Sequence, residues 1–166
     1  MSMIGNLLRV TNAELEAYLE DSSLLEDRIY DDEAETEDPN LVDIDKSWDG
    51  ILFLLTGQKF DENSTHPLTK VLFSGQMIDE DQDLGYGPGQ YLRPNQVKEL
   101  SEEISKISVE ELRKRYDAKK MTELDVYPTS WEDDDNVEYL TDNFISIQKV
   151  YAEAAKNGEA IITFIN

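Results

Sequence analysis

The chain has no cysteine and a single histidine, His66, among its 166 residues. Without cysteine, neither a disulfide nor a thiolate nucleophile can form, and a metal site with two histidine ligands is also excluded. No apolar run approaches the roughly 20 residues that span a bilayer, so we expect no transmembrane helix. The first residues also lack the basic stretch and apolar run of a signal peptide, so we expect a cytoplasmic protein.

Basic residues are scarce as well. Fifteen lysines and arginines stand against 37 aspartates and glutamates, which gives a formal net charge of −22. Such a charge repels nucleic-acid phosphates and anionic membranes, so we predict neither kind of partner. The same charge would attract a basic protein or imitate a polyanion. The alternative is that it serves solubility or adaptation to salt.

The acids are concentrated between Glu20 and Asp38, where Arg28 is the only base. A run of this kind predicts a solvated face or a mobile segment over about residues 20–39, and less often a docking surface. The bases gather elsewhere, and the one basic cluster consists of Arg113, Lys114, Arg115, Lys119 and Lys120. We interpret this cluster as counter-charge to the acidic body of the protein rather than as a nucleic-acid site.

The most apolar stretch, Leu41 to Gly57, begins where the acidic run ends. Leu41 to Ile44 predicts a short strand that leads the chain into the core. Apolar residues at the spacings of one helical face then predict a buried amphipathic helix; they are Ile44, Trp48, Ile51, Leu52 and Leu55. Asp45 is placed to cap the start of this helix, and Gly57 to end it in the left-handed conformation. We expect the fold to be organised around this helix.

Strands and helices alternate along the rest of the chain. Met3 to Val10 and Ala160 to Ile165 predict strands, and the continuous apolar character of the second suits a central position in a sheet. Capping boxes predict helices that begin after Thr11 and Ser108, and residues 137–157 predict a long helix. We therefore predict an α/β (or α+β) fold with a small mixed β-sheet flanked by about five to six helices, in a single layered domain over residues 1–166.

The motifs that would carry chemistry are incomplete. The glycine-rich stretch Gly85 to Gly89 lacks the lysine of a phosphate-binding loop, so we interpret it as an ordered structural loop unless the tyrosines beside it line a pocket. Asp79, Asp81 and Asp83 alternate as calcium ligands do, but the loop glycine and closing glutamate of an EF-hand are missing. We predict no catalytic residue, no metal site and no cofactor.

Four blocks carry a resemblance to a known family. They are Met3-Ile4-Gly5-Asn6 with Arg9-Val10, Asp43 to Ile51 with Leu54 to Gly57, Gly85-Tyr86-Gly87-Pro88 with Tyr91-Leu92 and Pro94, and Tyr151 to Ala155 with Gly158 and the closing strand. Together they resemble the YfbM-like bacterial proteins over nearly the whole chain. The resemblance implies a small bacterial α/β domain of unknown function and brings no established catalytic residue.

The shared blocks further imply that six residues converge, either as a polar-walled pocket or, as we favour, as framework of the fold: Asp43, Asp45, Lys46, Trp48, Tyr86 and Tyr91. Two functional hypotheses follow. The first is an acidic bacterial interaction protein that binds a basic protein partner, for example to neutralise a toxin. The alternative is a small-ligand binder or enzyme with a pocket under the Gly85–Gly89 loop. We favour the first, because the sequence contains no catalytic constellation.

Overall fold

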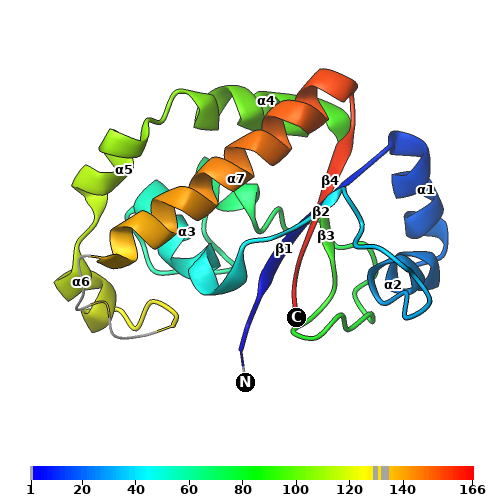
Figure 1. The fold of residues 1–166 in the computed structure, drawn as a ribbon, viewed down its shortest axis with the longest axis horizontal. Helices are drawn as coiled ribbons and strands as arrows, with labels where there is room; N and C mark the ends of the chain where they lie inside the picture. The colour runs from blue at the N-terminus through cyan, green and yellow to red at the C-terminus, as the bar shows by residue number, and fades with distance from the viewer. Residues whose placement is uncertain (1, 129–130, 132–134) are drawn as a thin grey trace.

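Four strands form one sheet in the computed structural model, which describes residues 2–128, 131 and 135–166. The strands are β1 (Gly5–Val10), β2 (Leu41–Asp43), β3 (Gln90–Leu92) and β4 (Ala160–Ile165), and their spatial order is β2-β1-β4-β3. The first and last strands of the chain are therefore the central strands of the sheet, as the ribbon in Figure 1 shows.

The two central strands pair along their whole length, from Gly5 opposite Ile165 to Val10 opposite Ala160. Every residue of β4 is buried, which confirms the central position predicted from its apolar run. All three strand pairs are antiparallel, whereas the sequence led us to expect a mixed sheet. The apolar run of β4 reflects burial on both faces of the sheet, and such burial does not require parallel pairing.

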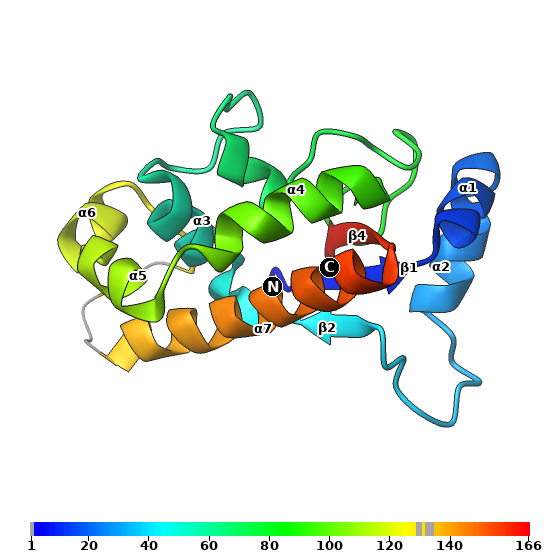
Figure 2. The same cartoon turned by 90° about the horizontal axis from the view of Figure 1, so that it is seen from above.

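Alternate residues of the strands face two separate hydrophobic cores. On one face, Leu8 and Ile162 belong to a small core that also contains side chains of α1 (Asn12–Glu20) and α2 (Ser23–Ile29). These two helices lie together at one end of the molecule in Figures 1 and 2. The small core is thus the layer that attaches the first two helices to the sheet.

On the other face, Leu7 and Ile161 belong to a larger core. The longest helices that contribute to it are α3 (Trp48–Thr56), α4 (Pro94–Ser105) and α7 (Asp135–Asn157), and α4 lies beside α7 in both ribbon views. The protein is therefore a layered α/β domain, as predicted, with helices on both faces of the sheet.

The part of the chain that the structure describes also contains several short helices. They are the α-helices α5 (Val109–Arg115) and α6 (Ala118–Glu123) and the 3₁₀ helices η1 (Asp45–Ser47) and η2 (Pro67–Val71). The described residues thus contain seven α-helices where five to six were expected, because α2 and α6 form from segments of only seven and six residues. Figure 1 places α5 and α6 at the end opposite to α1 and α2.

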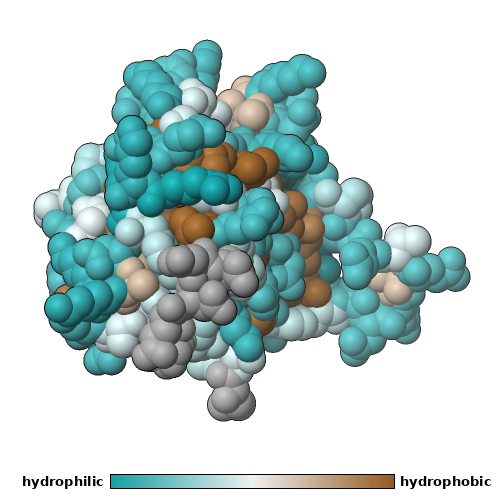
Figure 3. Space-filling model, turned by 60° about the vertical axis from the view of Figure 1, so that its left-hand side comes forward, coloured by the Kyte–Doolittle hydropathy of each residue, from teal (hydrophilic) through white to brown (hydrophobic). Residues whose placement is uncertain are grey.

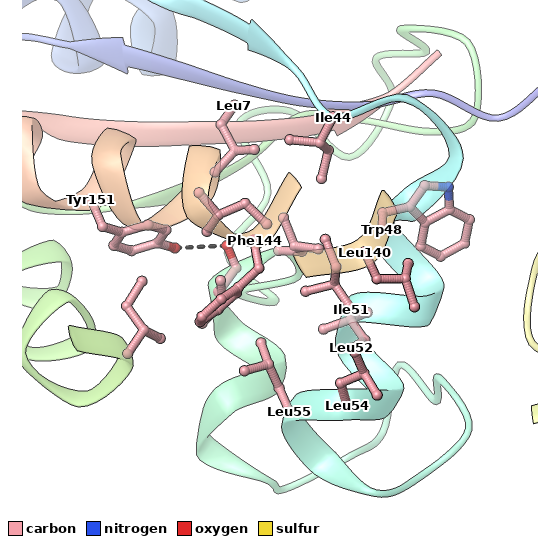
Figure 4. Packing of buried hydrophobic residues seen from close by; sticks show 14 of the residues in the cluster. Leu7, Ile44, Trp48, Ile51, Leu52, Leu54, Leu55, Leu140, Phe144 and Tyr151 are labelled. Atoms are coloured by element: carbon pink, nitrogen blue, oxygen red, sulfur yellow. Dashed lines mark hydrogen bonds between the residues drawn. The ribbon is translucent and has the colours of Figure 1, made fainter. Parts of the chain in front are cut away.

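The predicted organising helix is α3, in which every residue from Trp48 to Leu55 is buried. Figure 4 shows its side chains packed against Leu140 and Phe144 of α7. The two helices approach closely at Gly50, where an added Cβ would lie 2.7 Å from a methyl carbon of Leu140. The helix ends at Gly57 with a φ of 71°, which confirms the predicted left-handed cap.

The predicted N-cap of this helix was wrong. Asp45 has a φ of 54° and begins η1, so a 3₁₀ turn precedes α3. Ser47 then takes the cap position without a side-chain hydrogen bond. The carboxylate of Asp45 instead accepts a hydrogen bond from the hydroxyl of Tyr139, a residue 94 positions along the chain. A tertiary partner has therefore replaced the local one.

The capping box predicted at Thr11 was confirmed, whereas at Ser108 the structure shows only the hydroxyl cap and no reciprocal bond to the Glu111 side chain. The Glu14 N–H donates to the Thr11 hydroxyl at 3.1 Å, and the Glu14 carboxylate accepts from the Thr11 N–H at 2.9 Å. The Glu111 N–H likewise donates to the Ser108 hydroxyl at 3.1 Å. These caps depend on residues three positions apart, which is why the sequence alone predicts them.

Candidate functional site

The six residues singled out from the sequence lie in four places rather than in one pocket. Asp43, Asp45 and Lys46 lie together where β2 passes into η1. Trp48 lies inside the larger core, and Tyr91 packs against the smaller core on the other face of the sheet. Tyr86 is exposed and lines a separate cavity.

The first group is held by hydrogen bonds to α7. The Asp45 N–H donates to an Asp43 carboxylate oxygen at 2.6 Å, and the hydroxyl of Tyr139 donates to Asp45 at 2.6 Å. The same hydroxyl accepts from the Lys46 N–H at 3.0 Å. Burial, together with the hydrogen bond to Asp45, raises the pKa of Tyr139, so its proton stays in place. These contacts tie η1 to α7, which favours a framework role.

Trp48 is a core anchor. Its side chain is 5% exposed, and its indole N–H donates to the backbone oxygen of Met3 at 3.0 Å. Its ring stacks on Tyr127, with centroids 5.7 Å apart, and meets Phe60 and Phe73 edge to face. The indole therefore has the acceptor that a buried tryptophan needs, and it leaves no polar group for a ligand.

Backbone N–H groups of the Gly85–Gly89 loop are hydrogen-bonded to residues outside it. An oxygen of Asp83 accepts from the N–H groups of Gly85 and Gly87, and the N–H of Tyr86 donates to the Ile165 oxygen at 3.1 Å. Gly85 has a φ of 137°, and an added Cβ would lie 2.7 Å from the Cα of Asn166. The loop therefore requires glycine because it passes so close to the end of the chain.

A cavity of about 510 Å³ does lie beside this loop. Tyr86 and Pro88 line one part of it, and Phe60, Phe73 and Met77 line another. Of the six residues from the sequence, only Tyr86 lines it directly, and Trp48 lies behind the rings of its wall. We call this hollow the aromatic cavity.

A second hollow, of about 690 Å³, lies at the acidic end of the molecule, which we define as residues 12–39. Its floor comes from Asn6, Leu41 and Asp43 of the sheet, and α2 contributes Arg28 and Ile29. The rest of the wall is the acidic segment, represented by Asp31, Ala34, Glu35, Thr36, Glu37, Asp38 and Pro39. We call this hollow the acidic notch.

Arg28 is the one base of the acidic end, and its own neighbours occupy it. Its guanidinium binds an Asp38 oxygen at 2.9 Å and a Glu14 oxygen at 2.8 Å, and it also donates to the Tyr18 hydroxyl. The hydrogen bond from Arg28 lowers the pKa of Asp38 below its usual 3.8. Arg28 therefore holds α1, α2 and the acidic segment together.

The remaining carboxylates of the notch have no such cation. Asp31, Glu35, Glu37 and Asp43 line the notch, and none of them forms an ion pair with a lysine or arginine of the described residues. The sequence indicates the acidic run but not the notch, because the notch forms only when this run folds back over β2 and Asn6 of the neighbouring strand β1. Within the described chain, no group of three or more acidic or histidine side chains is arranged to hold a metal ion.

The fold and its two hollows define a small α/β domain with one strongly acidic end. Among the described residues, no helix has the length and apolar character to cross a membrane. The chain belongs to the family described as a domain of unknown function (DUF1877), whose sequence model matches residues 1–164.

Two relatives support this assignment and confirm the YfbM-like resemblance. Protein YfbM of Escherichia coli strain K12 is 28% identical over 133 residues, which is 77% of this chain and 74% of that protein. The crystal structure of YfbM, a protein of unknown function from Escherichia coli, matches with a TM-score of 0.72 and 22% identity. That match covers 98% of this chain and 99% of the other, so the two share one fold.

Proposed function

We propose that this protein binds a basic partner protein through its acidic end, and that the acidic notch receives a lysine or arginine side chain of that partner. The observation that carries the proposal is the notch itself, a hollow lined partly by the apolar side chains of Ile29 and Leu41 and partly by carboxylates, four of which have no cation among the described residues. The proposal develops the first of the two functional hypotheses and names the residues that would contact the partner.

The shape and chemistry of the notch suit a long basic side chain. Ile29 and Leu41 offer apolar surface to the aliphatic stem of a lysine or arginine. Glu35, Glu37 and Asp43 offer acceptors to its charged head, and hydrogen bonds between charged groups are stronger than neutral ones. A neutral or acidic side chain would leave these carboxylates unpaired.

The charge around the notch supports the same class of partner. The acidic end carries twelve acids and one base in residues 12–39. Such a concentration of one sign accelerates the approach of a basic protein, and salt weakens it because the Debye length falls to about 8 Å at physiological ionic strength. The attraction is therefore expected to set the rate of association more than its final strength.

The edge of the sheet offers a further contact. β2 is an edge strand, and its residues Leu41 and Asp43 also line the notch. An extended partner segment beside β2 would therefore reach the notch with its side chains, as in recognition by strand addition. The partner segment that fits best is extended and rich in lysine or arginine.

The test is a titration of the protein with a short oligolysine peptide at low and at physiological salt. We expect the double variant Glu35→Gln, Glu37→Gln to bind about fivefold more weakly than the unchanged protein. The matched control is Glu102→Gln, Glu153→Gln, which changes the net charge equally at exposed positions of α4 and α7. The control variant should lose less than about twofold.

Equal weakening in the two variants would contradict the proposal, since it would mean that the peptide senses only the net charge. Binding that persists unchanged at high salt would also contradict it. An oligoglutamate peptide serves as the negative probe at both salt concentrations.

A further inference from the structure

We infer a second binding site in the aromatic cavity, one that takes a small organic cation with apolar substituents, such as a methylated ammonium group. The cavity lies between residues 60–77, the loop after Gly85 and the end of β4, and it is distinct from the acidic notch. The inference does not depend on the partner protein proposed above. Its volume of about 510 Å³ is in the range of small-molecule sites.

Exposed apolar side chains gather at this cavity. Among the described residues, four large apolar side chains are strongly exposed: Leu24, Tyr30, Met77 and Tyr86. Two of them, Met77 and Tyr86, each 41% exposed, line the aromatic cavity. Exposed apolar groups that cluster beside a hollow are typical of a binding surface, whereas isolated ones are ordinary.

The aromatic wall is fixed before any ligand arrives. The rings of Phe60 and Phe73 lie 4.3 Å apart between centroids, and both contact the ring of Trp48. Trp48 in turn stacks on Tyr127 and is buried. A wall that is supported in this way loses little conformational freedom on binding, so less of the interaction energy is lost to ordering.

Three polar side chains of the wall are already hydrogen-bonded within the protein. The hydroxyl of Thr163 donates to the Leu72 oxygen at 2.7 Å, and the Gln90 side-chain oxygen accepts from the Gly75 N–H at 2.8 Å. The hydroxyl of Thr69 donates to Ser64 at 3.2 Å. These three groups are therefore occupied, whereas an alkylated ammonium group does not need a hydrogen bond from the wall.

The aromatic rings and the negative charge of the protein favour a positively charged ligand in this cavity. The faces of aromatic rings attract cations, and recognition of quaternary ammonium groups between aromatic side chains is an established use of this attraction. The net charge of −22 raises the local concentration of any cation, and Glu62 adds a carboxylate to the lining. Among the described residues that line the cavity, Lys70 is the only base, and it is exposed, so its ammonium group can remain in water.

The test compares choline with 3,3-dimethyl-1-butanol, an uncharged molecule of the same shape. Binding is followed by tryptophan fluorescence, because Trp48 contacts the wall, and by the NMR signal of the Met77 methyl group. We expect choline to bind about tenfold more tightly than the alcohol. Equal affinity, or no binding of either molecule, would overturn the inference.

Three variants locate the site. Tyr86→Ala should weaken choline binding about fivefold, because one ring of the wall is lost. Lys70→Ala should strengthen it about twofold, because a like charge is removed. Leu24→Ala, which truncates an equally exposed apolar side chain outside the cavity, should change nothing. A weakening on Lys70→Ala would mean that Lys70 contributes a favourable contact and that charge does not select the ligand, and the inference would then be wrong.

Discussion

The two ends of the molecule use charge in opposite ways. The acidic end, residues 12–39, carries twelve acids and one base, whereas α5 and α6 at the other end carry five bases and four acids over residues 109–123. At the basic end, Arg115 donates to the Leu54 oxygen at 3.1 Å and binds Glu111 at 3.3 Å, and Lys120 lies over the Phe53 ring. Arg115 and Lys120 are therefore used within the protein.

At the acidic end, most of the carboxylates have no basic partner in the part of the chain that the structure describes. Arg28 pairs with Glu14 and Asp38, and Arg93 pairs with Glu16, but the other carboxylates of the notch, which are Asp31, Glu35, Glu37 and Asp43, have no cation among the described residues. In Figure 3, with the left-hand end of Figure 1 turned forward, the surface is mostly hydrophilic and hydrophobic residues show only in places between polar ones. The comparison teaches that a charged surface suggests a partner only where the protein does not itself neutralise the charge.

The largest expected effect is at the acidic end. Arg28→Ala should lower the free energy of unfolding by about 2 kcal/mol, because it leaves Glu14 and Asp38 facing each other without a cation. Chemical denaturation measures the change. The matched control is Arg93→Ala, whose ion pair with Glu16 is far more exposed and should contribute much less to stability. Equal losses would mean that Arg28 does not hold this end together.

The stabilising effect of Arg28 should also depend on pH. Arg28 lowers the pKa of Asp38 below 3.8, so the ionised carboxylate stabilises the folded state. This contribution is present above pH 3.8 and is lost as the pH falls through the lower pKa of the folded protein. The difference in stability between the unchanged protein and Arg28→Ala should therefore shrink in acid, as unfolding curves across this range will show. A difference that stays constant would contradict the ion pair.

A carboxylate in the core should behave in the opposite way. Burial raises the pKa of Asp49, and one of its oxygens has no hydrogen-bond partner among the described residues. Protonated Asp49 therefore contributes stability to the folded state. This contribution is fully present below pH 3.8 and is lost as the pH rises through the raised pKa of the folded protein. Asp49→Asn keeps an acceptor for the Tyr127 N–H and should stabilise the protein by about 1 kcal/mol at pH 7, with no gain in acid.

The control for this prediction is Asp142→Asn, at an exposed position of α7, which should change the stability little at either pH. A loss of stability on Asp49→Asn at neutral pH would mean that the negative charge is itself required in the core. Thermal unfolding at the two pH values distinguishes these outcomes.

At the basic end we expect a smaller loss. Arg115→Ala removes the donor to the Leu54 oxygen near the C-terminus of α3, and it should lower the free energy of unfolding by about 0.5–1 kcal/mol. Arg113→Ala is the control, since Arg113 is exposed and forms no ion pair among the described residues. Equal effects of the two substitutions would mean that the internal use of Arg115 contributes nothing.

The smallest effect that we expect is a shift in Tm when charges are neutralised at either end, and it can be compared with the change in binding. Glu35→Gln, Glu37→Gln relieves repulsion at the acidic end and should raise Tm by about 1 °C while it weakens binding of oligolysine. Lys114→Gln, Lys119→Gln at the basic end adds net negative charge and should lower Tm by a similar amount with no loss of binding. If both pairs shift Tm in the same direction, the two ends do not differ as the comparison states.

Much of the fold could be predicted from the sequence because its signals are local. The apolar run of β4, the glycine that ends α3 and the Thr11 capping box each depend on residues within a few positions of one another. The Asp45 cap failed because a side chain from α7 competes for its carboxylate. The antiparallel pairing of every strand was also missed, because strand direction depends on how distant segments meet.

The sequence by itself determined the charge of the protein, the elements with local signals, and the family. Only the tertiary structure decided which polar groups have partners within the protein and which remain exposed and unpaired. It joined Asp45 to Tyr139, buried Trp48, and placed Tyr86 and Tyr91 at separate sites. It also laid the acidic segment over the β2 edge to form the notch. Periodicity and caps are properties of neighbouring residues, whereas a hollow is formed by surfaces that meet only when the layers pack.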